Sequence, residues 1–216
     1  MGDFGKVAVT AGYARVNVKD YSKVGAEYSY QNEFSNPDIG YKLAANANAY
    51  IGKDAGFSAG AYAGLDFGKT NCTQYNLGVI ADYTRAGSNK ASLTQNVTDL
   101  GDQKITDIAF DADIYSHQAL RAGGELGFTR NLCCDEDKKL SFALQGGAEL
   151  TSKPKLSTDG DKIVYDNKLN KTQAFIGARA EYSKVVNKNG NELFFRGNCM
   201  LSDNNSKGEI GIGFRF

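Results

Sequence analysis

Two neighbouring stretches, "YKLAANANAYI" (residues 41–51) and "FSAGAYAGLDF" (residues 57–67), alternate between two kinds of residue over the length of a strand. Successive residues of an extended chain face opposite sides, so each stretch has one apolar face and one face that is mostly polar or glycine. In both stretches alanine occupies the centre of the apolar face, with larger residues at its ends. A soluble β-sandwich shows the same alternation, but alanine fills the centre of a core poorly. The distribution favours strands that cross a bilayer and place aromatic rings at its interfaces.

Segments of this kind recur about twelve times along the chain, each roughly ten residues long, which is the length that a tilted strand needs to cross hydrocarbon. Short polar connections such as "GKDA" (52–55), "AGSNK" (86–90) and "DNNSK" (203–207) are typical of hairpin turns. We therefore predict an all-β fold, an antiparallel up-and-down transmembrane β-barrel of about 12 strands. About 10 strands is the alternative, if the weakly alternating segment near 91–99 is a loop. No linker divides residues 1–216, so we predict a single domain.

The composition gives no support to a nucleic-acid-binding protein or to a helical membrane protein. Lys and Arg together number 25, as do Asp and Glu, so the net charge of zero gives no indication of a nucleic-acid partner. The mean hydropathy is −0.43, and no apolar run approaches the roughly 20 residues of a membrane helix. The N-terminal "MGDFGKVAVT" lacks the features of a signal peptide, so we expect a chain that is not exported or whose signal peptide was removed.

The polar faces of the predicted strands carry many charged residues, which we expect to line the lumen. They are Glu27, Lys42, Asp66, Asp82, Asp107, Asp111, Asp113, Arg121, Glu125, Glu149, Arg179, Glu181, Arg196, Glu209 and Arg215. Acidic residues dominate the early strands and the arginines come late, so a meander would place an acidic wall opposite a basic one. Two interpretations stay open. Either the arginines face the acidic wall across water in a pore for ions or small polar solutes, or the charges pair and plug a narrow barrel. The second is slightly favoured, since about twelve strands is near the lower limit for an aqueous channel.

The last strand, "EIGIGFRF" (209–216), keeps its alternation up to the C-terminal residue. Ile210, Ile212, Phe214 and Phe216 share its apolar face, and pairing of the first and last strands would hold Phe216 in place. An alternating final strand with a C-terminal Phe resembles the terminal signature of Gram-negative outer-membrane β-barrel proteins, which include small porin-like and OmpA-like barrels. This resemblance implies an outer-membrane location, a lipid bilayer around the barrel, and recognition of these four residues by the barrel assembly machinery.

From these features we expect a structural or small pore-forming, porin-like outer-membrane protein. The alternatives are the translocator β-domain of an autotransporter, which also resembles a barrel of this kind, and, less favoured, a lipid-modifying barrel enzyme. The only histidine follows Ser116 in "YSHQ" (115–118), which we interpret as a turn. Adjacent strand residues face opposite sides, so this pair is poorly placed for catalysis. We expect no catalytic residues, no metal site and no cofactor.

The four cysteines and one long connection are the other notable features. Cys72, Cys133 and Cys134 lie in two connections that strand counting places at the same rim, which leaves open a disulfide from Cys72 to one of the pair. Cys199 belongs to an apolar face, where it is interpreted as a small apolar side chain. The connection 153–170 contains a "DG" turn between two short runs and could project beyond the membrane as a hairpin that binds a partner.

Overall fold

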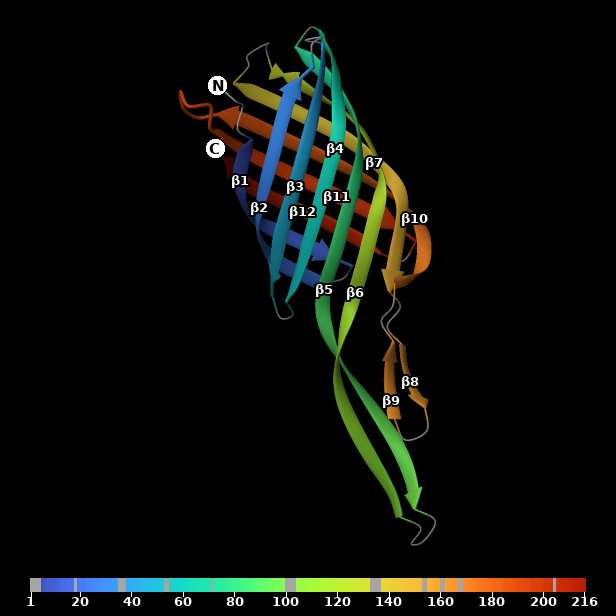
Figure 1. Cartoon of the computed structure of the whole chain (residues 1–216). Helices are drawn as coiled ribbons and strands as arrows, with labels where there is room; N and C mark the ends of the chain where they lie inside the picture. Colours follow the sequence, from blue (N-terminus) through green and yellow to red (C-terminus); the bar gives the residue numbers. More distant parts are fainter. Residues whose placement is uncertain are drawn as a thin grey trace.

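The computed structural model describes residues 5–17, 19–34, 38–52, 55–70, 72–99, 104–132, 137–152, 155–159, 162–166, 169–203 and 205–216. In this part of the chain ten strands form a closed antiparallel barrel, and two more form a separate hairpin (Figure 1). The barrel strands are β1 (Lys6–Val16), β2 (Lys19–Glu33), β3 (Ile39–Ile51), β4 (Gly56–Thr70), β5 (Thr73–Asp99), β6 (Lys104–Asn131), β7 (Lys138–Ser152), β10 (Leu169–Val185), β11 (Glu192–Ser202) and β12 (Ser206–Arg215). No helix in the described ranges is long and apolar enough to cross a membrane.

The barrel closes by pairing of its first and last strands. Ile212 of β12 lies opposite Ala11 of β1, and Phe214 lies opposite Val9. Val7 and Phe216 then exchange two backbone hydrogen bonds of 2.9 and 2.8 Å. Phe216 is therefore fixed by the seam, as the sequence predicted. Closure also removes the unpaired backbone edge that lipid cannot satisfy.

The wall is apolar outside and charged inside, the reverse of a soluble protein. Val79, Ile176 and Ile210 on the outer face are 63, 67 and 64 % exposed, whereas Arg121 and Glu149 on the inner face are 1 and 0 % exposed. Aromatic rings pair on neighbouring strands near the strand ends: Phe57 with Tyr83, Phe67 with Tyr75, and Phe128 with Phe142. Only a bilayer gives a favourable environment to an apolar surface of this extent, so the architecture is that of a transmembrane β-barrel.

The predicted number of about 12 wall strands is wrong, and the alternative of about 10 agrees with the structure. The segments near 91–99 and 104–114 do not cross the membrane as separate strands. They continue β5 and β6, which pair with each other from Ser88–Tyr115 to Asp99–Lys104. The pairing of β4 with β5 extends only to Ala86, and that of β7 with β6 begins at Ala119. Residues 88–99 and 104–115 thus form a two-stranded extension beyond the wall, the β5–β6 ribbon. The turns expected at 86–90 and 115–118 are continuous strand.

The ribbon lies at one end of the barrel, together with a second hairpin. This β8–β9 hairpin consists of β8 (Lys155–Asp159) and β9 (Lys162–Asp166), which pair only with each other in the described part of the chain. It confirms the hairpin predicted within 153–170. Figure 1 shows both extensions at the end opposite to the two chain termini. We call these ends the hairpin end and the terminal end.

Candidate functional site in the barrel interior

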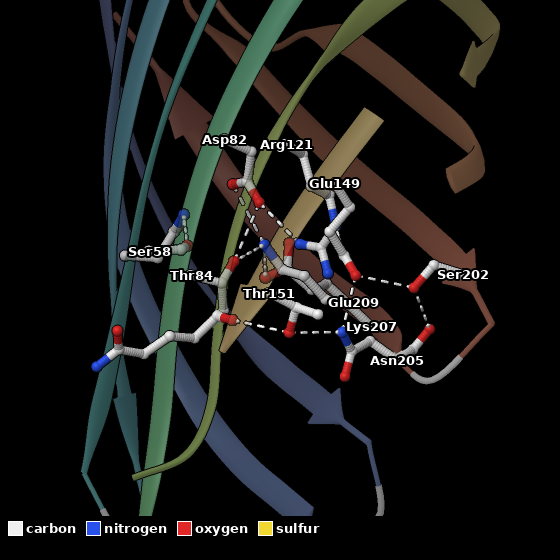
Figure 2. A network of polar contacts seen from close by, with 12 residues as sticks. Ser58, Asp82, Thr84, Arg121, Glu149, Thr151, Ser202, Asn205, Lys207 and Glu209 are labelled. Atoms are coloured by element: carbon white, nitrogen blue, oxygen red, sulfur yellow. Dashed lines mark hydrogen bonds and ion pairs between the residues drawn. The ribbon is translucent and has the colours of Figure 1, made fainter. Parts of the chain in front are cut away.

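At the hairpin end, Arg121 of β6 is enclosed by two carboxylates from the neighbouring strands. Its Nη1 lies 3.1 Å from Asp82 Oδ1, and its Nε lies 2.6 Å from Glu149 Oε2. Glu149 Oε1 also accepts hydrogen bonds of 2.6 to 2.9 Å, donated by Gln173, Ser202 and Asn205. Figure 2 shows this network on the inner face of the wall. The guanidinium and Glu149 are thus shielded from solvent, and the positive charge of Arg121 offsets part of the negative charge of the two carboxylates.

Lys207 of β12 extends this network across the lumen. Its Nζ lies 3.5 Å from Asp82 Oδ2 and 3.3 Å from Thr84 Oγ1, both on β5. Strands β12 and β5 are five positions apart in either direction around the ten-stranded wall, so they stand on opposite sides. The same ammonium lies 3.4 Å from Glu209 Oε1, which accepts a 2.7 Å hydrogen bond from the Tyr50 hydroxyl. A side-chain bridge therefore spans the whole diameter.

The rest of the hairpin end is closed by apolar packing. Ala14, Val16, Tyr21, Tyr50 and Ala86 form one buried cluster with exposures of 0 to 3 %. The Tyr21 and Tyr50 rings lie 5.7 Å apart, centre to centre. We call this cluster, with the network of Arg121, Asp82, Glu149, Lys207 and Glu209, the hairpin-end layer.

A second charged layer lies toward the terminal end. Arg196 of β11 contacts Glu27 and Glu181 at 2.5 Å each. Arg215 of β12 contacts Glu181 at 3.1 Å and Glu192 at 2.7 Å. Each arginine thereby joins carboxylates from two strands, and we call this group the terminal-end layer. Because Arg196 and Glu27 lie on β11 and β2, this layer also reaches across the seam.

The ring of Phe194 lies within the terminal-end layer. The guanidinium carbons of Arg196 and Arg215 are 5.1 and 4.7 Å from its centroid, a distance that suits cation–π attraction. Glycine at position 213 leaves space for the Phe194 ring, since a Cβ at that position would lie only 2.2 Å from the ring. The polar-face glycine of β12 therefore has a packing role.

Between the two layers lies a cavity of about 120 Å³. Arg179 of β10 lines it and contacts Glu125 of β6 at 2.6 Å. Lys42 of β3 lines it as well. Asp66 stands apart from this lining and accepts a 3.0 Å hydrogen bond from Gln31. The interior is therefore filled by paired side chains at two levels, with a small polar space between them.

Most of the residues predicted to line the lumen are brought together here. The two layers and the cavity lining include Glu27, Lys42, Asp82, Arg121, Glu125, Glu149, Arg179, Glu181, Arg196, Glu209 and Arg215. Asp66 is buried as well, but it lies outside both layers and bonds to Gln31. The interpretation in which the arginines face the acidic wall across open water is wrong for Arg121, Arg179 and Arg196, because each contacts a carboxylate directly. The placement of Asp107, Asp111 and Asp113 in the wall is also wrong. Their backbone belongs to the ribbon, and their side chains lie outside the described part of the structure.

Sequence reasoning missed several interior residues. Lys207 and Lys23 share the register of Glu209 and Glu27 on their strands, so the alternation alone could have identified them. Glu192 has the register of Arg196 in the same way. Tyr50 and Phe194 were harder to recognise, because an aromatic residue on a polar face gives no signal of its own.

The structure describes two of the four cysteines, and only one of these two is in a disulfide bond. Cys72 is disulfide-bonded, and its carbonyl accepts a 2.8 Å hydrogen bond from the Asn131 amide at the end of β6. Cys133 and Cys134 lie outside the described residues. Cys199 is free and exposed on the outer face, in agreement with its predicted apolar register.

No protein-family model and no curated protein matches the sequence. Solved structures with a similar shape include the beta domain of the Bordetella autotransporter Brka, at 10 % identity and a TM-score of 0.45, covering 99 % of each chain. The translocator domain of the autotransporter NalP from Neisseria meningitidis has 7 % identity and a TM-score of 0.43, covering 100 % of this chain and 89 % of the other. Neisserial surface protein A has 13 % identity and a TM-score of 0.37, with coverages of 98 and 94 %. These likenesses are distant, and the assignment as a transmembrane barrel rests on the closed wall and its apolar exterior.

Proposed function

We propose that the protein is an outer-membrane barrel with a closed lumen, which anchors the β5–β6 ribbon and the β8–β9 hairpin at one membrane surface. The contact between Lys207 and Asp82, from opposite walls, is the observation that carries this proposal. A pore needs a continuous water-filled path, and here buried ion pairs occupy the cross-section instead. The barrel then serves as a support, and the binding function belongs to its extensions.

The position of the extensions supports an outward orientation. Outer-membrane barrels have short periplasmic turns and longer extracellular connections. Both long connections of this chain lie at the hairpin end, opposite to the termini. At about 3.4 Å per residue the ribbon reaches roughly 40 Å beyond the wall, far enough to contact a partner outside the membrane.

The alternatives are less well supported. A small pore is the second candidate, favoured by the polar cavity between the layers, and conductance distinguishes it from a closed barrel. An autotransporter domain must pass a polypeptide through its lumen, and even one helix with its side chains is about 10–12 Å wide. The Lys207–Asp82 bridge occupies that space. For a lipid-modifying enzyme, Ser116 and His117 are consecutive residues of β6, and consecutive strand residues belong to opposite faces.

The orientation can be tested with a specific protease site inserted into the connection 100–103 between β5 and β6. We expect the protease to cut this site when it is added to intact cells, because the proposal places this connection outside the outer membrane. The matched control carries the same site in the terminal-end turn 187–190, which should be cut only after the outer membrane is permeabilised. Protection of the first site together with cleavage of the second in intact cells would contradict the proposal.

A further inference from the structure

The cavity between the hairpin-end and terminal-end layers has the size of a small-molecule site. Its lining includes Lys207 and Asp82 from the first layer and Arg196 and Phe194 from the second, so it is bounded at both levels. Its volume is about 120 Å³. An engineered protein cavity of about 150 Å³ admits benzene, so a ligand of roughly four to six non-hydrogen atoms fits here.

One of the cations that line the cavity lacks a direct carboxylate partner in the described part of the chain. Among its lining residues, five cations face four carboxylates: Lys23, Lys42, Arg179, Arg196 and Lys207 against Glu27, Asp82, Glu125 and Glu209. Each cation except Lys42 has a carboxylate oxygen within 3.5 Å. Lys42 has no ion pair with any residue that the structure describes. Among the described residues, Lys42 is therefore the one cation of the lining that no carboxylate contacts directly.

None of the described charged neighbours of Lys42 forms an ion pair with it. They are Arg179, Glu181, Arg215 and Glu27, with Asp66 on the adjacent strand. Glu27 and Glu181 are already held by Arg196 and Arg215. Asp66 bonds to Gln31 and does not line the cavity. An ammonium without a partner is costly in a low-dielectric interior, and a bound anion would remove that cost.

The hydrogen-bonding groups around the cavity define the ligand further. Arg179 donates from Nη2 to Glu125, which leaves its other N–H groups available to an oxyanion. On the same wall, the side-chain oxygens of Gln145 and Asn198 are buried and accept no hydrogen bond in the structure. A ligand that suits these groups accepts from Lys42 and Arg179 and donates to one of the two amide oxygens.

We propose that this cavity binds a small monovalent carboxylate that also carries a hydroxyl group. The carboxylate neutralises Lys42, and the hydroxyl donates to Gln145 or Asn198. This site is separate from the anchoring function, and its test does not depend on whether the lumen conducts.

The test is the thermal unfolding midpoint of the refolded protein in detergent, with sodium glycolate, sodium acetate or sodium chloride at equal ionic strength. We expect glycolate to raise the midpoint saturably, by about 5 °C at a hundredfold excess over its dissociation constant. Acetate, which lacks the hydroxyl, should act only at higher concentration, and chloride should have no specific effect. Lys42→Met should abolish the glycolate shift, while Lys42→Arg should keep it.

A second pair of variants keeps the test decisive if Lys42→Met does not refold. Asn198→Leu and Gln145→Leu each remove one of the two acceptors and keep the charge, so one of them should bring the glycolate response close to that of acetate. Three results would overturn the proposal: glycolate with no more effect than chloride, equal responses to acetate and glycolate in the unaltered protein, or a full glycolate shift in Lys42→Met.

Discussion

Arg121→Met is expected to lower the free energy of unfolding of the barrel by about 3–5 kcal/mol, the usual cost of removing one partner from a buried ion pair. Arg121 is 1 % exposed, and it lies between Asp82 and Glu149, of which Glu149 is 0 % exposed. Without the guanidinium, Glu149 keeps only neutral donors and Asp82 keeps Lys207. Two carboxylates would then share too little positive charge in a site that water does not reach.

The measurement is urea unfolding in lipid vesicles, followed by circular dichroism, since the chain contains no tryptophan. Arg15→Met is the matched control. Arg15 lies 3.7 Å from Asp20, and both side chains are more than half exposed, so its loss should cost at most about 1 kcal/mol. If Arg121→Met costs no more than Arg15→Met, water enters the hairpin-end layer and the account of a closed lumen is wrong.

Val79→Arg should produce the second large effect, a loss of about 2–4 kcal/mol, because it places a charge on the lipid face at mid-wall. Val79 is 63 % exposed and lies opposite Ala63 on one side and Gly124 on the other. Ile51→Arg is the matched control. Ile51 is similarly exposed, at 56 %, but it ends β3 at the hairpin end. Near the interface the same charge should cost only about 0–1 kcal/mol.

The two variants are compared by the same vesicle unfolding experiment. The account predicts a clear difference between them, because the cost of a lipid-facing charge depends on its depth. Equal, small losses at both positions would mean that the apolar outer face is not in contact with hydrocarbon.

The wall of the barrel could be predicted from the sequence because two of its properties, the face of each residue and the closure, depend only on the order of residues within a strand. Alternation assigns each residue to a face, which placed Val79 outside and Glu125 inside. Closure followed from the unbroken final strand, and Phe216 does pair with Val7. The number of strands was less predictable, since the small and polar residues 86–90 resemble a hairpin turn, although they lie within the continuous strand β5. One strand that leaves the membrane and two strands joined by a turn therefore look alike in the sequence.

The partners inside the lumen could not be predicted in the same way. Lys207 and Asp82 are separated by 125 positions along the chain, and they meet because the strand stagger brings them to the same height on opposite walls. Alternation gives the face of a residue but not its height along the barrel axis. For this reason the sequence left open whether the arginines face open water or pair with carboxylates, and the register places each beside a carboxylate.

The most direct test of the closed lumen is conductance of the refolded protein in a planar bilayer, with insertion confirmed by heat-modifiable mobility in gels. The account predicts no discrete current steps above those of the bare bilayer, because Lys207, Asp82 and Arg121 close the hairpin end. Reproducible steps with a preference for one ion would contradict it and would establish the interior as an open pore.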